Sequence, residues 1–550
     1  MKNLKTRARL ALAIFAICSV AFAGFVTLAL AQQLGTITFP TSGASNAQPL
    51  FLEGVKDLHN FQFDEAAVAF QKVEQLDPNF AMAYWGEAMS HNHPLWAEVN
   101  VPAAQKALEK LAPTPEGRVA KAKTDKEKAY LDALNQLFYG SDDKLARDTA
   151  YSQAMAKMYD RWPTDHEVDV LYALSLLGTV RPGDEGFRRQ ALAAAICLKV
   201  FQENPNHPAA AHFIIHAFDD PDHAILALPA ARAYAKIAPS AAHALHMPSH
   251  IFLRLGMWQD VIKSNIAAYQ SSIALIQRLH LPEGREDFHT LSWLQYANLM
   301  VGNFDEAKKD MNLAKAAADR NPNSPNVQRG YQAMHARYIL ETGQWEKIPL
   351  QVMTQPASGS GASMPGMYMG ADDEWWTFIA GYSAIKLGDP ATADQAIAQL
   401  HAMAEKEGAN SYAAKPFSIM EKELIAEADL ARGQKDDALQ AAKQAADIDR
   451  TLASPSGPPD PIKPGLEVYG DVLLATGHAK EAAAVYEEQL LRTPNRTPSV
   501  KALARAKGAQ ISMATPKPYR RWTQFVRRVW LSQTSEMKTN RADYLPNSCP

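Results

Sequence analysis

Histidine is the residue type whose number and spacing point to chemistry in this chain. Seven of the sixteen histidines lie between residues 207 and 250. His212 and His216 are four residues apart, and His246 and His250 repeat this spacing 34 residues later. Side chains at i and i+4 of an α-helix lie on one face, about 5–6 Å apart. Because imidazole nitrogens suit zinc, copper and iron, the two pairs together predict a transition-metal site.

An acid and a proline near these histidines bear on that prediction. Asp219 lies about one helical turn beyond His216, where we expect it to be a fifth ligand or a hydrogen-bond acceptor for a liganding imidazole. Pro248 falls between His246 and His250 and is expected to kink the helix there. Such a kink would move His250 out of line with His246.

The elements that would position the histidines follow a repeat of 34 residues. Pro205 and Pro239 each close a helix-like stretch and are 34 residues apart. Before Pro78, small and aromatic residues occupy the slots of a tetratricopeptide repeat, a pair of antiparallel helices, with positions 8, 17, 20 and 24 filled by Gly54, Phe63, Ala66 and Phe70. Small residues at positions 8 and 20 let the two helices pack closely, and the larger ones fill the space to the next repeat.

The same frame recurs along the chain, most visibly as a glycine at position 15, between the two helices. These glycines are Gly256, Gly302, Gly343, Gly388, Gly433 and Gly477. We therefore predict an all-α fold, a right-handed α-solenoid of about eleven helical hairpins over residues 47–510. The Gly/Met-rich segment 355–373 is expected to project from it as a loop.

Three stretches resemble one group of exported bacterial tetratricopeptide proteins, and together the likeness spans most of residues 47–507. They are Met82 to Met89 followed by His93-Pro94-Leu95-Trp96, Pro239 to Trp258, and Val468 to Arg496. The resemblance implies a repeat scaffold of largely unassigned function and carries over no catalytic residues.

The resemblance also implies that positions 2, 5, 9 and 12 of each first helix face a concave groove. His212 and His216, and likewise His246 and His250, then occupy positions 5 and 9 of consecutive repeats. Four further residues are expected to line the groove as ligand contacts: His243, His289, Trp85 and His93. Three interpretations of the histidines stay open, namely a transition-metal site, a structural polar groove, and a site for a peptide or organic anion.

The amino-terminal end of the chain predicts export. Residues 1–31 combine basic residues, an uncharged run and a closing Ala-Leu-Ala, which is typical of a signal peptide. The mature protein is thus expected in the periplasm or outside the cell, or anchored by an uncleaved leader. Residues 32–46 are expected to be a linker, and residues 511–550 a basic extension. Membrane contact is expected only through the leader or this extension.

Charge and motifs narrow the function. The net charge is −3, and removing the four basic residues of the leader makes it −7, which argues against a nucleic-acid partner. No nucleotide-binding loop, nucleophile elbow or zinc-protease motif occurs in the sequence. The leading prediction is an exported, non-catalytic scaffold for a protein, peptide or small ligand. The alternative is a metal-dependent enzyme or metal-binding protein holding zinc, copper or iron.

Overall fold

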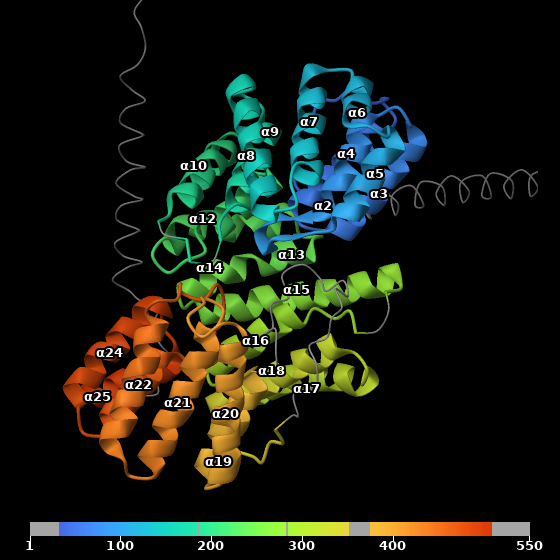
Figure 1. The fold of residues 1–550 in the computed structure, drawn as a ribbon. Helices are drawn as coiled ribbons and strands as arrows, with labels where there is room; N and C mark the ends of the chain where they lie inside the picture. The colour runs from blue at the N-terminus through green and yellow to red at the C-terminus, as the bar shows by residue number, and fades with distance from the viewer. Residues whose placement is uncertain (1–31, 182, 185, 282–283, 351–373, 509–550) are drawn as a thin grey trace, which may run out of the picture.

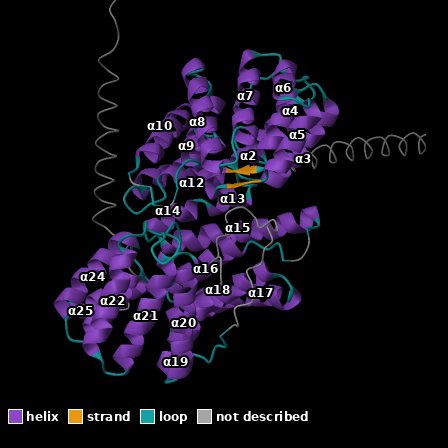
Figure 2. Cartoon of the chain, viewed as in Figure 1, coloured by secondary structure: helices purple, strands orange, loops and turns teal. Residues whose placement is uncertain are grey.

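The structure is a computed structural model that describes residues 32–181, 183–184, 186–281, 284–350 and 374–508 (Figure 1). Within these ranges nearly all regular structure is α-helical, which confirms the predicted all-α solenoid (Figure 2). The predicted leader 1–31, loop 355–373 and extension 511–550 lie outside the described residues. Among the described helices, none is both long and apolar enough to cross a membrane.

The elements follow one another as short antiparallel helices, interrupted once by a small β-hairpin. The N-terminal part contains α2 (Gln48–His59), α3 (Phe63–Leu76), α4 (Ala81–Met89), β1 (Asn92–His93), the 3₁₀ helix η1 (Pro94–Trp96), β2 (Glu98–Val99), α5 (Val101–Leu111), α6 (Pro115–Lys121), α7 (Asp125–Tyr139), α8 (Lys144–Arg161), α9 (His166–Leu177) and α10 (Arg188–Glu203). The strands pair antiparallel.

The central part carries the histidine-rich region. Its helices are α11 (Pro208–Ala217), α12 (Ala224–Ile237), α13 (Ala242–His246), α14 (Pro248–Arg254), α15 (Trp258–Leu279), α16 (Phe288–Met300), α17 (Phe304–Arg320) and α18 (Pro325–Thr342). The C-terminal part contains α19 (Glu374–Leu387), α20 (Pro390–Lys406), α21 (Lys415–Ala431), α22 (Lys435–Asp449), α23 (Gly465–Ala475), α24 (Ala479–Arg492) and α25 (Thr497–Ala506).

Glycines at the predicted turns explain where the first helix of many hairpins ends. All six glycines assigned to position 15 have φ between +63° and +94°, a left-handed conformation that favours glycine. One predicted hairpin is incomplete, because residues 344–350 after Gly343 form no helix.

Close packing within the hairpins follows from small residues facing aromatic ones. A Cβ atom on Gly54 would lie 2.9 Å from the Phe70 ring, and one on Gly86 would lie 2.3 Å from it. Phe70 on α3 therefore fits between α2 and α4 only because both neighbours present glycine there. This is the packing that the repeat frame predicts for positions 8 and 24.

Residues 32–46 are not a linker, contrary to the prediction. Leu34 and Phe39 are buried, and the backbone N–H of Thr36 donates to the carbonyl of Asn206 at 2.9 Å. Farther along, Ser42 donates from its backbone and its hydroxyl to the Glu127 carboxylate. The segment is an extended strap across the N-terminal repeats, held by hydrogen bonds that the repeat pattern does not reveal.

The last repeats close back onto the middle of the chain, where the loop between α24 and α25 contacts the turn between α14 and α15 (Figure 1). The indole N–H of Trp258 donates to the carbonyl of Asn495 at 3.1 Å. The buried Arg496 guanidinium binds the carboxylates of Glu467 and Glu341 at 2.8 and 2.7 Å. These long-range contacts add to the stacking between neighbouring repeats.

Candidate metal centre

Four short helices of the central part present six histidines to one region. The first, α11, starts at Pro208, whose ring is preorganised for a first helical position, and the Ala210 N–H donates to the His207 side chain. At the start of α16, the Asp287 carboxylate accepts from the Thr290 N–H. Between them the predicted break at Pro248 is present, since α13 ends at His246 and α14 begins at Pro248.

The first group of three is His212, His216 and His243. The His212 Nε2 atom lies 3.0 Å from the Nε2 atoms of both His216 and His243. One candidate ligand atom from each residue lies within 4.8 Å of the other two. We call this group the first triad.

The second group is His246, His250 and His289. The His246 Nε2 atom lies 3.2 Å from Nε2 of His250 and 3.1 Å from Nε2 of His289. The break at Pro248 therefore does not separate His250 from His246, because Met247 between the helices keeps helical dihedral angles. We call this group the second triad.

The Nδ1 atoms of three of these histidines form hydrogen bonds with oxygen atoms, and these bonds determine which ring nitrogen is protonated. The Nδ1 atoms of His212 and His250 donate to the His59 carbonyl and the Asp219 carboxylate, both at 2.7 Å, because these oxygens only accept. The His246 Nδ1 atom donates at 2.6 Å to the Asn265 side-chain oxygen. The amide of Asn265 is oriented by its own donation to the Val261 carbonyl.

This proton placement leaves lone pairs facing each other. With Nδ1 protonated, a neutral imidazole carries no hydrogen on Nε2. The Nε2 atoms of His246 and His250, 3.2 Å apart, therefore cannot form a hydrogen bond with each other while both rings are neutral. A cation between the two nitrogens resolves this repulsion.

Burial disfavours the charged form of five of the six triad histidines. It lowers the pKa of His212, His216, His243 and His246 well below the ordinary histidine value, and the charges of neighbouring imidazoles lower it further. The same two causes lower the pKa of His289 to about 3. At these five rings a metal ion is therefore a better candidate than a proton for a cation on Nε2.

Asp219 is not part of either triad, but it forms a hydrogen bond with His250 of the second triad. Its carboxylate accepts from His250 Nδ1 and, at 2.9 Å, from Nε of the buried Arg254. The Arg254 charge and the hydrogen bonds hold the pKa of Asp219 below its usual range, although burial alone would raise it. Of the two roles predicted for Asp219, the structure supports the acceptor and not the ligand.

An Asp219→Asn variant is expected to weaken metal binding at the second triad by about 10–100-fold, the usual effect of losing a partner of a liganding histidine. The asparagine oxygen can still accept from Arg254, but its NH₂ group would face His250 Nδ1. His250 would then favour the tautomer with its proton on Nε2, and that proton must move before Nε2 can bind a metal. Titration of metal-free protein with zinc, followed by calorimetry, measures the change. Asp220→Asn is the matched control, because Asp220 pairs with His223 outside both triads.

The residues predicted to line a ligand groove have different surroundings. His243 and His289 complete the two triads and so belong with the metal-ligand candidates. Trp85 is fully buried between Phe39 and Tyr130, with ring centroids 5.8 and 5.4 Å away, so the prediction that it lines a groove is corrected.

His93 lies in β1 beside the first triad without joining it. Its ring lies 4.2 Å from that of Phe63, and its Nδ1 atom is 3.6 Å from the Glu98 carboxylate. The neighbouring Trp96 ring is 6.3 Å from that of His243. The motif that contains His93 thus supplies an aromatic wall near the triad.

Two aromatic residues that cover the triads are not evident from the histidine pattern. The Phe61 ring lies 4.4 Å from His212, and the Trp293 ring lies 4.4 Å from His250. Phe61 occupies position 15 of its repeat and has φ +55°, a conformation that is costly for a bulky side chain. A phenylalanine where other repeats have glycine is the sequence signal that could have singled it out.

A third cluster, formed by His59, Glu167 and His207, has a structural explanation. All three residues are buried, and both histidines contact the carboxylate, at 2.7 and 3.3 Å. Burial alone would raise the pKa of Glu167, but the charge of His59 and the two hydrogen bonds outweigh it and lower the pKa to about 2. The cluster is a satisfied ion network that also fixes the His59 carbonyl against the first triad.

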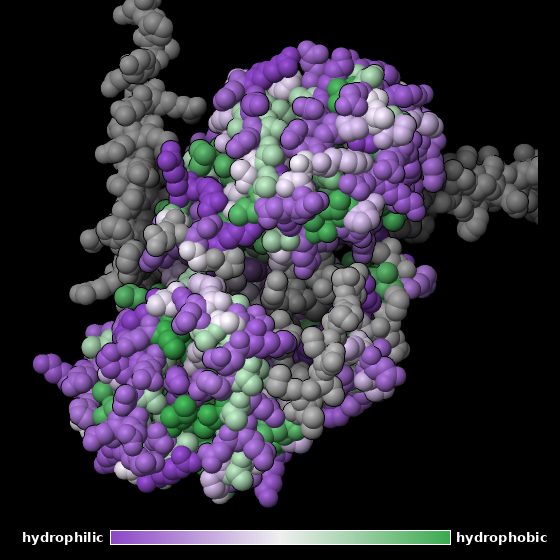
Figure 3. All heavy atoms as spheres, viewed as in Figure 1, coloured by the Kyte–Doolittle hydropathy of each residue, from purple (hydrophilic) through white to green (hydrophobic). Residues whose placement is uncertain are grey.

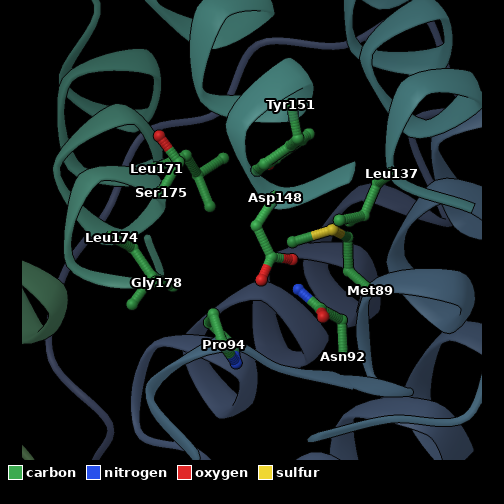
Figure 4. Close-up of a pocket in the computed structure, with 10 residues that line it drawn as sticks. All are labelled: Met89, Asn92, Pro94, Leu137, Asp148, Tyr151, Leu171, Leu174, Ser175 and Gly178. Atoms are coloured by element: carbon green, nitrogen blue, oxygen red, sulfur yellow. The ribbon is translucent and has the colours of Figure 1, made fainter. Parts of the chain in front are cut away.

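Two hollows lie away from the triads. A cavity of about 10 Å³ between α4, α7, α8 and α9 has room for one water molecule at most; its lining residues include Asp148, Tyr151 and Ser175 (Figure 4). A groove of about 760 Å³ lies between α16–α18 and the C-terminal part. It is bordered by apolar residues such as Trp345 and by side chains of both charges, Glu341, Glu427, Glu467, Asp471, Lys386, Lys463, Lys501 and Arg505. Elsewhere hydrophilic side chains cover most of the visible surface, with hydrophobic ones in small scattered groups (Figure 3).

No family model matches the chain, and no curated protein matches it. Similar solved structures include the human IFIT1 dimer with m7Gppp-AAAA, which is 12% identical over 88% of this chain and 99% of that chain, with a TM-score of 0.36. Yeast Tom70 is 12% identical over 84% of this chain and 95% of its own, with a TM-score of 0.30. A Rap protein complexed with competence and sporulation factor is 12% identical over 74% of this chain and 100% of its own, with a TM-score of 0.31. At such low identities and TM-scores, none of these proteins informs the function of this chain.

Proposed function

We propose that this protein is an exported metal-binding α-solenoid that holds two transition-metal ions, one on each histidine triad. The observation that carries the proposal is the convergence of three Nε2 atoms within each triad, while oxygen acceptors hold the opposite nitrogens of His212, His246 and His250. This is the arrangement of liganding imidazoles in metalloproteins, where an outer acceptor fixes the tautomer of the ligand.

The distances within each triad suit a bound ion. Nitrogen ligands bind zinc at about 2.0–2.1 Å, so two nitrogens on one tetrahedral ion lie about 3.3 Å apart. The Nε2 separations given above, 3.0 Å in the first triad and 3.1 to 3.2 Å in the second, are close to this value. Three protein ligands leave a fourth position open for an exogenous molecule.

Metal analysis of the native protein tests this proposal. The protein is isolated without a histidine tag from the periplasmic or secreted fraction, its amino terminus is determined, and its metal content is measured. We expect an amino terminus at Gln32 and two zinc, copper or iron ions per chain, because imidazole ligands suit these metals. Metal-free protein that also fails to bind these ions when they are added would contradict the proposed metal function.

A scaffold function for a protein, peptide or small ligand is the second candidate. The groove of about 760 Å³ supports it, because apolar residues and charged residues of both signs border one concave space. That groove lies between α16–α18 and the C-terminal part, and not at the histidines, where the sequence predicted it. Protein that binds no metal would leave this candidate as the proposed function. The absence of a nucleic-acid partner stays a prediction, based on the net charge.

A further inference from the structure

The two triads lie next to each other and have no carboxylate among their ligand candidates. Ring centroids of His216 and His250 are 6.3 Å apart, and those of His243 and His246 are 6.5 Å apart, so each triad borders the other. The nearest carboxylate that we identify, Asp219, is neutralised by Arg254. All six candidate ligands are therefore imidazoles, which bind a metal ion in their neutral form.

A neutral, partly buried ligand set favours ions of low charge. His212 and His246 are almost completely buried, and moving charge into such a site without compensation is costly. Two divalent ions would add four positive charges that no carboxylate of either triad offsets. Two copper(I) ions would add only two, and imidazole is a suitable ligand for copper.

We infer, building on the proposed function, that the two triads form a binuclear copper centre that binds dioxygen between its two ions. Each copper(I) ion bound by three imidazoles has an open coordination position. One dioxygen molecule binding to both open positions receives one electron from each ion. Two copper(I) ions become two copper(II) ions, dioxygen is reduced to the level of peroxide, and no proton is needed.

The aromatic residues at the triads fit a small, uncharged ligand. Phe61 packs on His212, His216 and His243 of the first triad. Trp293 packs on all three histidines of the second triad, with ring centroids 4.4 to 5.4 Å away. These rings limit the access of bulk water and of larger molecules, but a diatomic gas needs no polar recognition group.

A hydrolytic zinc pair is the main chemical alternative, and the structure favours it less. Hydrolytic two-metal sites hold their ions about 3.5–4 Å apart and need the positive charge to be offset. The carboxylate of Glu167 cannot serve as a bridge between the triads, because it is buried and engaged by His59 and His207. The absence of any carboxylate in either triad separates this centre from such sites.

The test uses the full chain, stripped of metal with a chelator and reloaded with copper(I) under anaerobic conditions. We expect two copper ions per chain and, on exposure to air, uptake of one dioxygen per chain. A new charge-transfer absorption should appear without an electron paramagnetic resonance signal, because the two copper(II) spins couple through the bridging ligand.

Several outcomes would overturn the inference. Two bound copper ions that do not react with dioxygen, or that give the paramagnetic signal of two isolated copper(II) ions, would refute the binuclear centre and leave the proposed metal function intact. Failure to bind copper or any other transition metal would refute both.

Two variants provide the internal comparison. His289→Ala should retain one copper ion, which becomes paramagnetically visible after oxidation because its partner is missing. His223→Ala removes a histidine outside the triads and should behave like the wild-type protein.

Discussion

A double variant with His212→Ala and His246→Ala is expected to lose both metal ions while keeping its helical structure. Each substitution removes the histidine whose Nε2 atom lies at 3.0 to 3.2 Å from both other members of its triad. The loss of affinity should exceed the roughly 10–100-fold expected from losing an outer partner, because a metal ligand itself is removed. Metal content by mass spectrometry and circular dichroism of the same sample measure the two properties.

The matched control for this variant removes two histidines outside the triads. A His166→Ala and His223→Ala variant deletes the partners of Glu203 and Asp220 at the protein surface and should keep both metal ions. Each single triad variant, His212→Ala or His246→Ala, should keep one ion. A folded double triad variant with an unchanged metal content would show that the histidines are structural and that our site assignment is wrong.

An Arg496→Met variant is expected to lower the free energy of unfolding by about 3–5 kcal/mol, the usual effect of breaking a buried ion pair by removing one partner. Arg496 is only 1% exposed and binds the carboxylates of Glu467 and Glu341. Without the guanidinium, both carboxylates remain in the interior with less compensation. Urea denaturation followed by circular dichroism measures the change.

Arg450→Met is the matched control, because Arg450 binds both oxygens of Glu488 at 2.7 Å, but on the surface. Exposed ion pairs contribute about 0–1 kcal/mol to stability. A similar loss of unfolding free energy in both variants would therefore contradict the stabilising role that we assign to the buried Arg496 pair.

Acid should narrow the stability difference between wild type and Arg496→Met. Burial alone would raise the pKa of Glu467, but the charges of Arg496 and Lys463 lower it from 4.5 to about 2. A carboxyl group whose pKa is lower in the folded than in the unfolded protein stabilises the folded state at any pH above the unfolded-state pKa. This contribution disappears as the pH falls from 4.5 toward 2.

The repeat frame predicted most of the fold and four of the six triad histidines because it depends on local geometry. Glycine at position 15 determines where a helix ends, and the spacing of four residues puts His212 with His216 and His246 with His250 on one helix face. The frame also placed His243 and His289 at inward positions. It did not predict which histidines from different helices come together in each triad. That division depends on the angle between α11, α13, α14 and α16, which periodicity does not contain.

The errors arose where segments outside the repeat frame pack onto it. Trp85 occupies an inward position, yet Phe39 of the strap covers it, and no periodic signal marks the strap. Arg496 lies at the end of the repeats, and its contact with Tyr296 joins residues 200 positions apart. Such contacts depend on the curvature of the whole array, which accumulates over many repeats.

The strap of residues 32–46 has a consequence for the order of folding. Its backbone pairs with residues Asn206 and Ser240, so the first residues after the predicted leader complete their contacts only when much later ones are present. Closing so long a loop costs conformational entropy before any contact compensates for it, which slows folding. A chain that is synthesised from its amino terminus therefore cannot fold its N-terminal repeats fully one after another. It must hold the strap unpaired until about 240 residues have emerged.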